Sequence, residues 1–305
     1  DSRAWKTEAT PWVKMARHLN AFPQGAGRSS RGAQMAMLPP IALVFAATDP
    51  TGGAGLQADI LTLASHGCHP VSVVTAITVQ DMHGVRNLRA LERYWVEQQA
   101  LALLEEFPVA AFKIGVIGSA ENVDAIAAIL ARHPRVPVVL DPVLASGRGD
   151  PLASQATVAA LREKLLPLAT VLTPNSLEAR QLAGAEETCG LAECAVRLTA
   201  RGCEYVLITG THEPGAEVVN TLYGAAGTVL VDRRQRLPGS YHGSGCTLAS
   251  AIAAQLAKGL QVPEAVRAAQ DFTWRALASG FRPASGQFLP DRFFWAPEKR
   301  REAGP

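Results

Sequence analysis

The sequence lacks the features that mark several large protein classes. No apolar run of about 18 residues occurs outside Ala-rich segments, and those segments carry Gln, Lys or Glu, which argues against membrane-spanning helices. The five cysteines form no CxxC pair and have no zinc spacing with histidine, so neither a zinc module nor a disulfide framework is indicated. This cysteine usage favours a reducing compartment, and we expect a cytoplasmic protein.

The chain also lacks a large net charge of either sign. Charged residues make up 18% of the chain and the net charge is +2, so no strong field for a polyanion is expected. The arginines are scattered along the chain and form no basic stripe. We therefore expect a small-molecule substrate as partner, and neither nucleic acid nor a membrane.

The first 36 residues differ from the rest of the chain. They are basic and poor in acids, and they contain no apolar core of signal-peptide length. An organelle transit peptide is one interpretation. We favour an extension or a mis-assigned start codon, with Met37 as the working start. The sequence thus predicts a poorly ordered extension over 1–36, one domain over 37–282 and a loose C-terminal tail over 283–305.

From residue 39 onward, strand and helix patterns alternate. Short apolar runs such as 41–47, 71–76 and 205–209 have the length of buried strands, and segments of helical length follow them. A Gly-Ala-Ala-Gly turn at 224–227 lies between two β-rich runs and predicts a hairpin. The alternation predicts an α/β fold with a mostly parallel central sheet and helices on both faces, a three-layer α/β/α architecture. Ligands of such sheets bind at the carboxyl ends of the strands.

A glycine-rich stretch at 242–247, His-Gly-Ser-Gly-Cys-Thr, runs directly into an Ala/Leu-rich helix. The start of a helix presents free N–H groups and the positive end of its dipole, so it attracts anions. The small residues Gly243, Ser244 and Gly245 let a phosphate approach the backbone. We expect these surroundings to lower the pKa of the Cys246 thiol. The stretch therefore predicts chemistry on a phosphate, with Cys246 at the point of reaction.

Polar residues follow several other predicted strands. Asp141 ends a strand and could organise the waters of Mg²⁺, although a turn or cap role is the alternative. Glu178 falls in the first turn of a helix and could share that metal, while Asn175 could be merely the N-cap of the same helix. Gln80 ends the segment 75–80, where its amide could pair with a planar heterocycle or simply face solvent.

A second glycine-rich turn, at 48–55, lies between a predicted strand and a predicted helix. It lacks the G-x-G-x-x-G spacing of a dinucleotide site and the Gly-Lys-Ser/Thr of a P-loop. Glycine is common in such turns, so the segment alone indicates little. It gains weight because another glycine-rich helix entry occurs late in the chain.

Taken together, these stretches resemble the ribokinase-like superfamily, and within it the hydroxymethylpyrimidine and phosphomethylpyrimidine kinases of thiamine biosynthesis. The resemblance runs from about Met37 to Phe281 and implies the ribokinase-like fold. The pieces that carry it, in the same order as in the family, are 47–59, 75–80, 113–115, 140–143, 172–175 and 242–247.

The resemblance assigns roles to particular residues. It implies an anion hole at residues 243–246, where sugar kinases have an Asp base and pyrimidine kinases have a Cys at the position of Cys246. Two departures occur: the family often has Gly at Ala47, beside the heterocycle, and commonly has Lys at Thr209, against the ATP phosphates. The implied contacts are Asp59, Gln80, Val143 and Ala47 for the substrate, Asn175, Thr209 and Thr247 for the nucleotide, and Asp141 and Glu178 for the metal.

The resemblance also implies the reaction. It is the ATP- and Mg²⁺-dependent phosphorylation of 4-amino-5-hydroxymethyl-2-methylpyrimidine and then of its monophosphate, by a homodimer, with Cys246 taking the proton of the alcohol. Two alternatives stay open. One is a pyridoxal or pyridoxine kinase of the same superfamily; Gln80 and residues 82–84 would distinguish the two rings by size and donor pattern. The other is a non-catalytic pyrimidine sensor, favoured by the missing Lys at Thr209.

Overall fold

The computed structural model describes residues 38–146, 149–283 and 285–296. Its described residues from Pro39 onward fall into one compact unit. The expected extension over 1–36 lies outside the described residues. The boundaries drawn at 37 and 282 therefore stay predictions.

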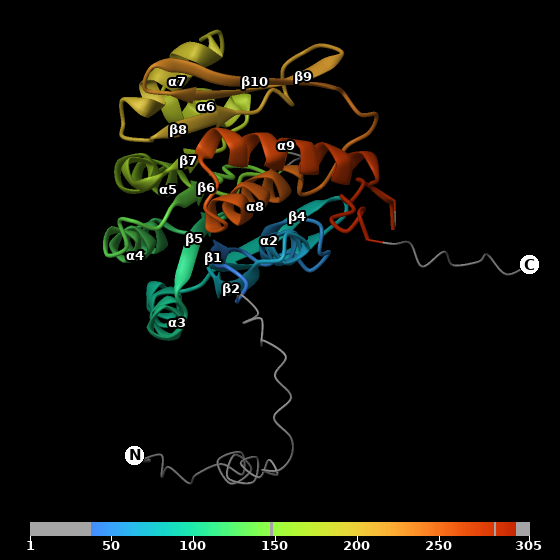
Figure 1. Cartoon of the computed structure of the whole chain (residues 1–305). Helices are drawn as coiled ribbons and strands as arrows, with labels where there is room; N and C mark the ends of the chain where they lie inside the picture. Colours follow the sequence, from blue (N-terminus) through green and yellow to red (C-terminus); the bar gives the residue numbers. More distant parts are fainter. Residues whose placement is uncertain (1–37, 147–148, 284, 297–305) are drawn as a thin grey trace, which may run out of the picture. The chain divides into compact units, whose positions relative to one another are not determined.

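A sheet of eight strands forms the centre of this unit (Figure 1). Its strands are β1 (Ile41–Ala46), β2 (His69–Val74), β5 (Val109–Ile114), β6 (Val138–Leu140), β7 (Val171–Leu172), β8 (Tyr205–Ile208), β9 (Glu217–Gly224) and β10 (Gly227–Gln235). Their order across the sheet is β10-β9-β8-β7-β6-β5-β1-β2. All neighbours from β2 to β8 pair in parallel, and β9 and β10 add an antiparallel edge. The expected mostly parallel sheet, with a hairpin near its end, is confirmed.

Helices cover both faces of the sheet, as expected (Figure 1). They are α2 (Gly55–Ser65), α3 (Arg93–Glu106), α4 (Ala120–Ala131), α5 (Gln155–Ala160), α6 (Ser176–Ala183), α7 (Leu191–Thr199), α8 (Ser244–Ala257) and α9 (Val262–Ala278). Residues 161–168 continue α5 as one π and one 3-10 turn.

The alternation of side chains along β1 explains why a layer of helices covers each face of the sheet. Leu43 and Phe45 belong to one buried cluster, with residues of α4, α6 and α7, whereas Ala42 and Val44 belong to another, with α2, α8 and α9. Successive side chains of a strand point to opposite faces, so an uninterrupted apolar strand needs a cover on each side. The Ala-rich α8 is buried on nearly every side, because it packs against the sheet, α2 and α9.

A small hairpin stands apart from the main sheet. β3 (Ala76–Asp81) and β4 (Gly84–Ala90) pair antiparallel in a separate two-stranded sheet. The preceding strand was predicted to extend to residue 76, and β4 was not predicted. In the structure β2 ends at Val74, and the next backbone N–H, that of Thr75, donates to Ala46. The hairpin thereby carries Gln80 over the carboxyl ends of the parallel strands.

The C-terminal stretch was expected to be loose, which is wrong for residues 285–296. Phe281 and Leu289 exchange two backbone hydrogen bonds. The Phe288 ring packs on Tyr241, and the Phe294 ring packs on Phe272. These aromatic contacts bury apolar surface and hold the segment against the rest of the fold. Its Pro-rich and charged composition did not indicate them.

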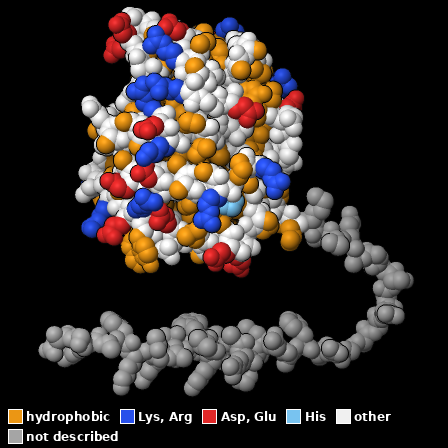
Figure 2. Space-filling view, turned by 90° about the vertical axis from the view of Figure 1, so that its left-hand side faces the viewer, with side chains coloured by type: hydrophobic (Ala, Val, Ile, Leu, Met, Phe, Trp, Pro, Cys, Tyr) orange, Lys and Arg blue, Asp and Glu red, His pale blue; other side chains and the backbone are white. Residues whose placement is uncertain are grey.

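The surface is mixed in character. On the face seen in Figure 2, basic and acidic side chains are interspersed with apolar ones and gather in no large patch of one sign. In the part of the chain that the structure describes, no helix has the length and apolarity needed to cross a membrane.

Candidate active site

A cavity of about 520 Å³ lies at the carboxyl ends of the parallel strands. This is the place where the strand order predicts a ligand site. Most of the residues singled out from the sequence line it. They are Ala47, Gln80, Asp141, Val143, Asn175, Glu178, Thr209, Gly243, Ser244, Gly245 and Cys246.

Two predicted contact residues, Asp59 and Thr247, do not line the cavity. Asp59 is fully buried beneath it, and Lys113 and Ser250 occupy its carboxylate oxygens. Thr247 is also fully buried, and its hydroxyl donates to the Gly243 carbonyl. The structure therefore contradicts two predictions, namely that Asp59 contacts the substrate directly and that Thr247 contacts the nucleotide directly. Both residues support the wall of the cavity from behind.

The two glycine-rich turns meet at the mouth of α8. Gly243 is the N-cap of this helix, with φ +80°, and a Cβ atom there would overlap the carbonyl oxygen of Gly53. The Thr247 N–H makes the first helical bond, to Gly243, so the N–H groups of residues 244–246 precede it. α2 begins at Gly55, whose N–H is directed at the Cys246 sulfur. Two helix N-termini thus converge on one point, which favours an anion there.

Cys246 lies at this point, but its thiol is not acidified. It is 9% exposed, and burial raises its pKa to about 12. This value includes opposing contributions, since Lys113 and the Gly55 N–H lower the pKa whereas Asp141 and Asp59 raise it. The prediction of a lowered pKa is therefore wrong, because desolvation and two carboxylates outweigh the helix N-terminus. At neutral pH the sulfur carries its proton.

A buried ion cluster lies under the thiol. Lys113 is fully buried, and its Nζ lies 2.8 Å from one oxygen of Asp59 and 3.8 Å from Oδ2 of Asp141. Burial lowers the pKa of Lys113, but Asp59, Cys246 and Asp141 together raise it above its usual value. Ser250 completes the cluster by donating to Asp59 at 2.7 Å. Lys113 had no predicted role beyond the motif at 113–115, although one charge inside an apolar strand indicates a buried partner.

Asp141 and Glu178 both line the cavity. Burial raises the pKa of Asp141 to about 6. Burial, together with repulsion from Asp141, raises the pKa of Glu178 to about 7. Among the described atoms, Asp141 Oδ2 has no hydrogen-bond partner. The described residues hold no cluster of three His, Cys, Asp or Glu side chains that could cage a metal by themselves. One or two carboxylates beside a phosphate site is, however, the donor set that Mg²⁺ usually takes.

The expected N-cap at Asn175 is present. Its side chain accepts from the N–H groups of Leu177 and Glu178, and Glu178 in return accepts from the Asn175 N–H. A second Glu178 oxygen accepts from Leu144. This capping box fixes the carboxylate of Glu178 toward the cavity. Thr209 bonds through its N–H to Pro174 and so lies beside Asn175 at the end of the neighbouring strand. Nucleotide contacts by Asn175 and Thr209 stay predictions.

His242 is a site residue to which the sequence analysis gave no role. Its Nε2 lies 2.8 Å from Asp49 Oδ2 and 3.3 Å from the Gln80 side-chain amide. Burial raises the pKa of Asp49, but hydrogen bonds from His242, Thr51 and Ala54 hold it at about 2. Because Nε2 donates to this carboxylate, the Gln80 atom facing it is best assigned as the oxygen. That orientation leaves the amide NH₂ of Gln80 available as a donor in the cavity.

Val143 forms part of the cavity wall in an unusual conformation. Its φ is +30°, and no other non-glycine residue in the described ranges has a positive φ. For a β-branched residue this backbone is strained by about 1–3 kcal/mol. Such strain persists where the surroundings fix it, and it is common at ligand sites. Val143 and Ala47 together give the cavity an apolar wall.

Comparison with known proteins agrees with this geometry. The sequence profile of the phosphomethylpyrimidine kinase family matches residues 49–290. The hydroxymethylpyrimidine/phosphomethylpyrimidine kinase of Streptomyces coelicolor is 40% identical over 261 residues, which cover 85% of this chain and 96% of that protein.

Solved structures give the same result. The ADP complex of Bacillus subtilis pyridoxal kinase superposes with a TM-score of 0.75 at 29% identity, covering 84% of this chain and 98% of that one. A phosphomethylpyrimidine kinase from Clostridium difficile superposes with a TM-score of 0.68 at 32% identity, covering 77% and 98%. The expected ribokinase-like fold is thus confirmed. This chain belongs to the phosphomethylpyrimidine kinase family.

Proposed function

We propose that this chain transfers the γ-phosphoryl group of ATP to 4-amino-5-hydroxymethyl-2-methylpyrimidine, and then a second one to the resulting monophosphate. The observation that carries the proposal is the position of Cys246. It lies where two helix N-termini converge, at the floor of a cavity whose wall includes Gln80 and Val143. This arrangement suits an alcohol on a flat heterocycle that faces a phosphate.

Binding and positioning make up most of the catalysis. The Gln80 amide would pair with the ring, and Val143 and Ala47 would pack on its apolar face. The N–H groups at residues 244–246 would stabilise the negative charge that spreads over the equatorial oxygens of the transferring group. Phosphoryl transfer depends chiefly on such alignment and electrostatics.

The proton of the alcohol needs an acceptor. A thiol with a pKa of about 12 cannot accept it without releasing its own proton. Asp141 lies beside the sulfur and, with a pKa of about 6, is ionised at neutral pH. We propose a relay in which the alcohol proton moves to the sulfur while the thiol proton moves to Asp141. The alcohol oxygen then bonds to the γ-phosphorus, and the bond to the β-phosphate oxygen breaks.

The carboxylates also fit a divalent cation. Glu178, with Asp141 beside it, would hold Mg²⁺ together with the phosphates of the nucleotide. When bound, Mg²⁺ neutralises charge on the phosphates. The proposal retains the substrate, nucleotide and metal contacts assigned from the sequence, except those of Asp59 and Thr247.

Pyridoxal phosphorylation is the second candidate. The similarity to the Bacillus subtilis pyridoxal kinase favours it, since that enzyme's fold matches this chain closely. The two rings differ in size and donor pattern, which Gln80 and the β3–β4 turn at Met82 would sense.

A coupled assay tests the proposal. ADP release is measured with MgATP and, separately, the pyrimidine alcohol, its monophosphate and pyridoxal as acceptors. We expect turnover with both pyrimidines and weaker turnover with pyridoxal. Faster turnover with pyridoxal than with the pyrimidines would favour the pyridoxal kinase function instead. Pyrimidine binding without ADP release would indicate a sensor. The cytoplasmic location and homodimer implied by the resemblance stay predictions, and size-exclusion chromatography with light scattering tests the latter.

A further inference from the structure

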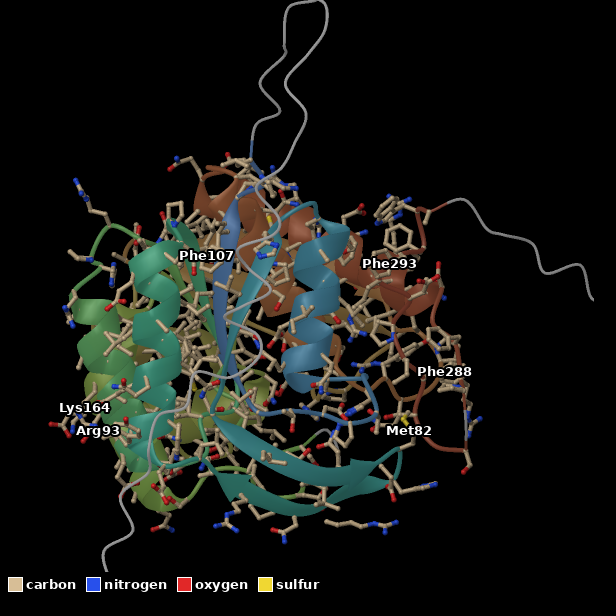
Figure 3. The ribbon with its side chains drawn as sticks, turned by 90° about the horizontal axis from the view of Figure 1, so that it is seen from below. Met82, Arg93, Phe107, Lys164, Phe288 and Phe293 are labelled. Carbon is tan, nitrogen blue, oxygen red and sulfur yellow. The ribbon has the colours of Figure 1, made fainter. Side chains whose placement is uncertain are left out.

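The C-terminal segment 285–296 contributes Gln287 to the cavity lining and contacts parts of the chain that are far apart in sequence. Ser285 lies 3.2 Å from the His83 ring, and Gly286 packs so closely on Met82 that a Cβ atom would clash. Figure 3 shows Met82 at the tip of the hairpin and Phe288 on the C-terminal segment. Phe288 and His242 share a backbone hydrogen bond of 2.9 Å. The segment therefore contacts both the hairpin and the loop that enters α8.

Arg292 is the most buried charged group of this segment, at 4% exposure. Its Nε donates to the Thr247 hydroxyl at 3.1 Å, and its NH2 donates to the Gly53 carbonyl at 2.5 Å. Thr247 belongs to the first turn of α8, whereas Gly53 belongs to the first glycine-rich turn. The guanidinium thus ties together the two turns whose N–H groups surround Cys246.

The contact geometry at Gly53 shows how little freedom the turns have. Gly243 packs against the same Gly53 carbonyl oxygen that Arg292 binds. Thr247 accepts from Arg292 while its hydroxyl donates to the Gly243 carbonyl. A continuous set of hydrogen bonds and contacts therefore runs from Arg292 through both turns to the N-cap of α8.

The charge of Arg292 is also unusual. Within the described part of the chain Arg292 forms no ion pair, although a buried cation ordinarily has an anionic partner. The acidic and thiol groups that act on it are those of the same corner, namely Cys246, Asp59 and Asp49. A positive charge behind the mouth of α8 adds to the helix dipole and favours an incoming phosphate.

We propose that Arg292 is a positioning residue for phosphoryl transfer, which holds the two glycine-rich turns in register around the transferring phosphate. This inference rests on the proposed kinase function. The family profile ends at residue 290, so Arg292 lies just beyond the part of the chain that the family match covers. It acts through Gly53 and Thr247 and does not line the cavity itself.

Steady-state kinetics of the full chain test the proposal with Arg292→Met, Arg292→Lys and the control Arg275→Met. Arg275 is an exposed arginine that lies over the Phe294 ring. We expect kcat with the pyrimidine alcohol to fall by about 100-fold in Arg292→Met, the size that loss of alignment produces, while the Kd of the pyrimidine stays unchanged. Added guanidinium ion should restore part of the activity of Arg292→Met. Arg292→Lys should remain impaired, because an ammonium group cannot reproduce the two-pronged contact.

The Kd of ADP with aluminium fluoride, a mimic of the transferring phosphoryl group, gives a second readout. We expect Arg292→Met to weaken this complex more than it weakens ADP alone. Equal kcat in Arg292→Met and wild type would overturn the proposal and leave the kinase function intact. The proposal would also be overturned if the loss of kcat in Arg292→Met were explained by a lower unfolding temperature alone and added guanidinium did not restore activity. An inactive wild type would instead refute the proposed function.

Discussion

Replacing Asp141 by Asn should stabilise the protein while it destroys the proposed reaction. Lys113, Asp59 and Asp141 form a buried cluster that carries one unbalanced negative charge once Asp141 is ionised. Burial raises the pKa of Asp141 from 3.8 to about 6. A shift of roughly two pKa units corresponds to about 3 kcal/mol of lost stability when the group is fully ionised. An amide of the same shape removes that cost.

The pH dependence gives the sign of the effect. Because the folded protein binds the Asp141 proton more tightly than the unfolded chain does, this group favours folding below pH 4, and the benefit disappears as pH rises through about 6. The advantage of Asp141→Asn over wild type should therefore be absent near pH 4 and reach about 3 kcal/mol by pH 8.

Urea unfolding at pH 5, 6.5 and 8 without Mg²⁺ measures this difference. Asp59→Asn is the matched control. Asp59 compensates the buried Lys113, so its loss should destabilise the fold at pH 8. Lower stability of Asp141→Asn than of wild type at pH 8, or a difference that does not change with pH, would refute the account of the cluster.

Three further substitutions test separate features of the site. Lys113→Met leaves Asp59 buried without its partner and should cost about 3–5 kcal/mol in urea unfolding; a loss below about 1 kcal/mol would contradict the buried pair. Val143→Gly relieves a φ of +30° and should change stability by less than about 1 kcal/mol, since backbone entropy offsets the relief, while KM for the pyrimidine rises. An unchanged KM would remove Val143 from the substrate wall. Gly243→Ala should lower kcat by at least about 10-fold, because its Cβ atom meets the Gly53 carbonyl, whereas Gly259→Ala, with a similar φ in open space, should leave kcat unchanged. Equal effects of the two glycine substitutions would contradict the tight contact between the turns.

The sheet and the mouth of α8 follow from the sequence because their signals are local. The apolar run of β1 is read directly from its residues, and the glycines and Cys246 lie within one short stretch before an Ala-rich helix. Asn175 and Glu178 have capping-box spacing, so their mutual hydrogen bonds were also accessible. Elements of this kind need no knowledge of distant partners.

What the sequence did not reveal depends on distant contacts. β3 and β2 are separated by Thr75 alone, so their apolar residues merge into one pattern. The pKa of Cys246 depends on burial and on Asp59 and Asp141, which come from other elements. Arg292 is one basic residue among several in the C-terminal stretch, and only the fold brings it to Gly53. Charge and burial at the site are therefore properties of the packing.

The central claim is that Cys246 at the mouth of α8 serves phosphoryl transfer to the pyrimidine alcohol. Its most direct test is single-turnover ADP formation by Cys246→Ala, with the Kd of the pyrimidine measured in parallel. We predict a loss of at least about 100-fold in rate, the lower range for removal of a proton-transfer group, with an unchanged Kd. A wild-type rate in Cys246→Ala would contradict the account.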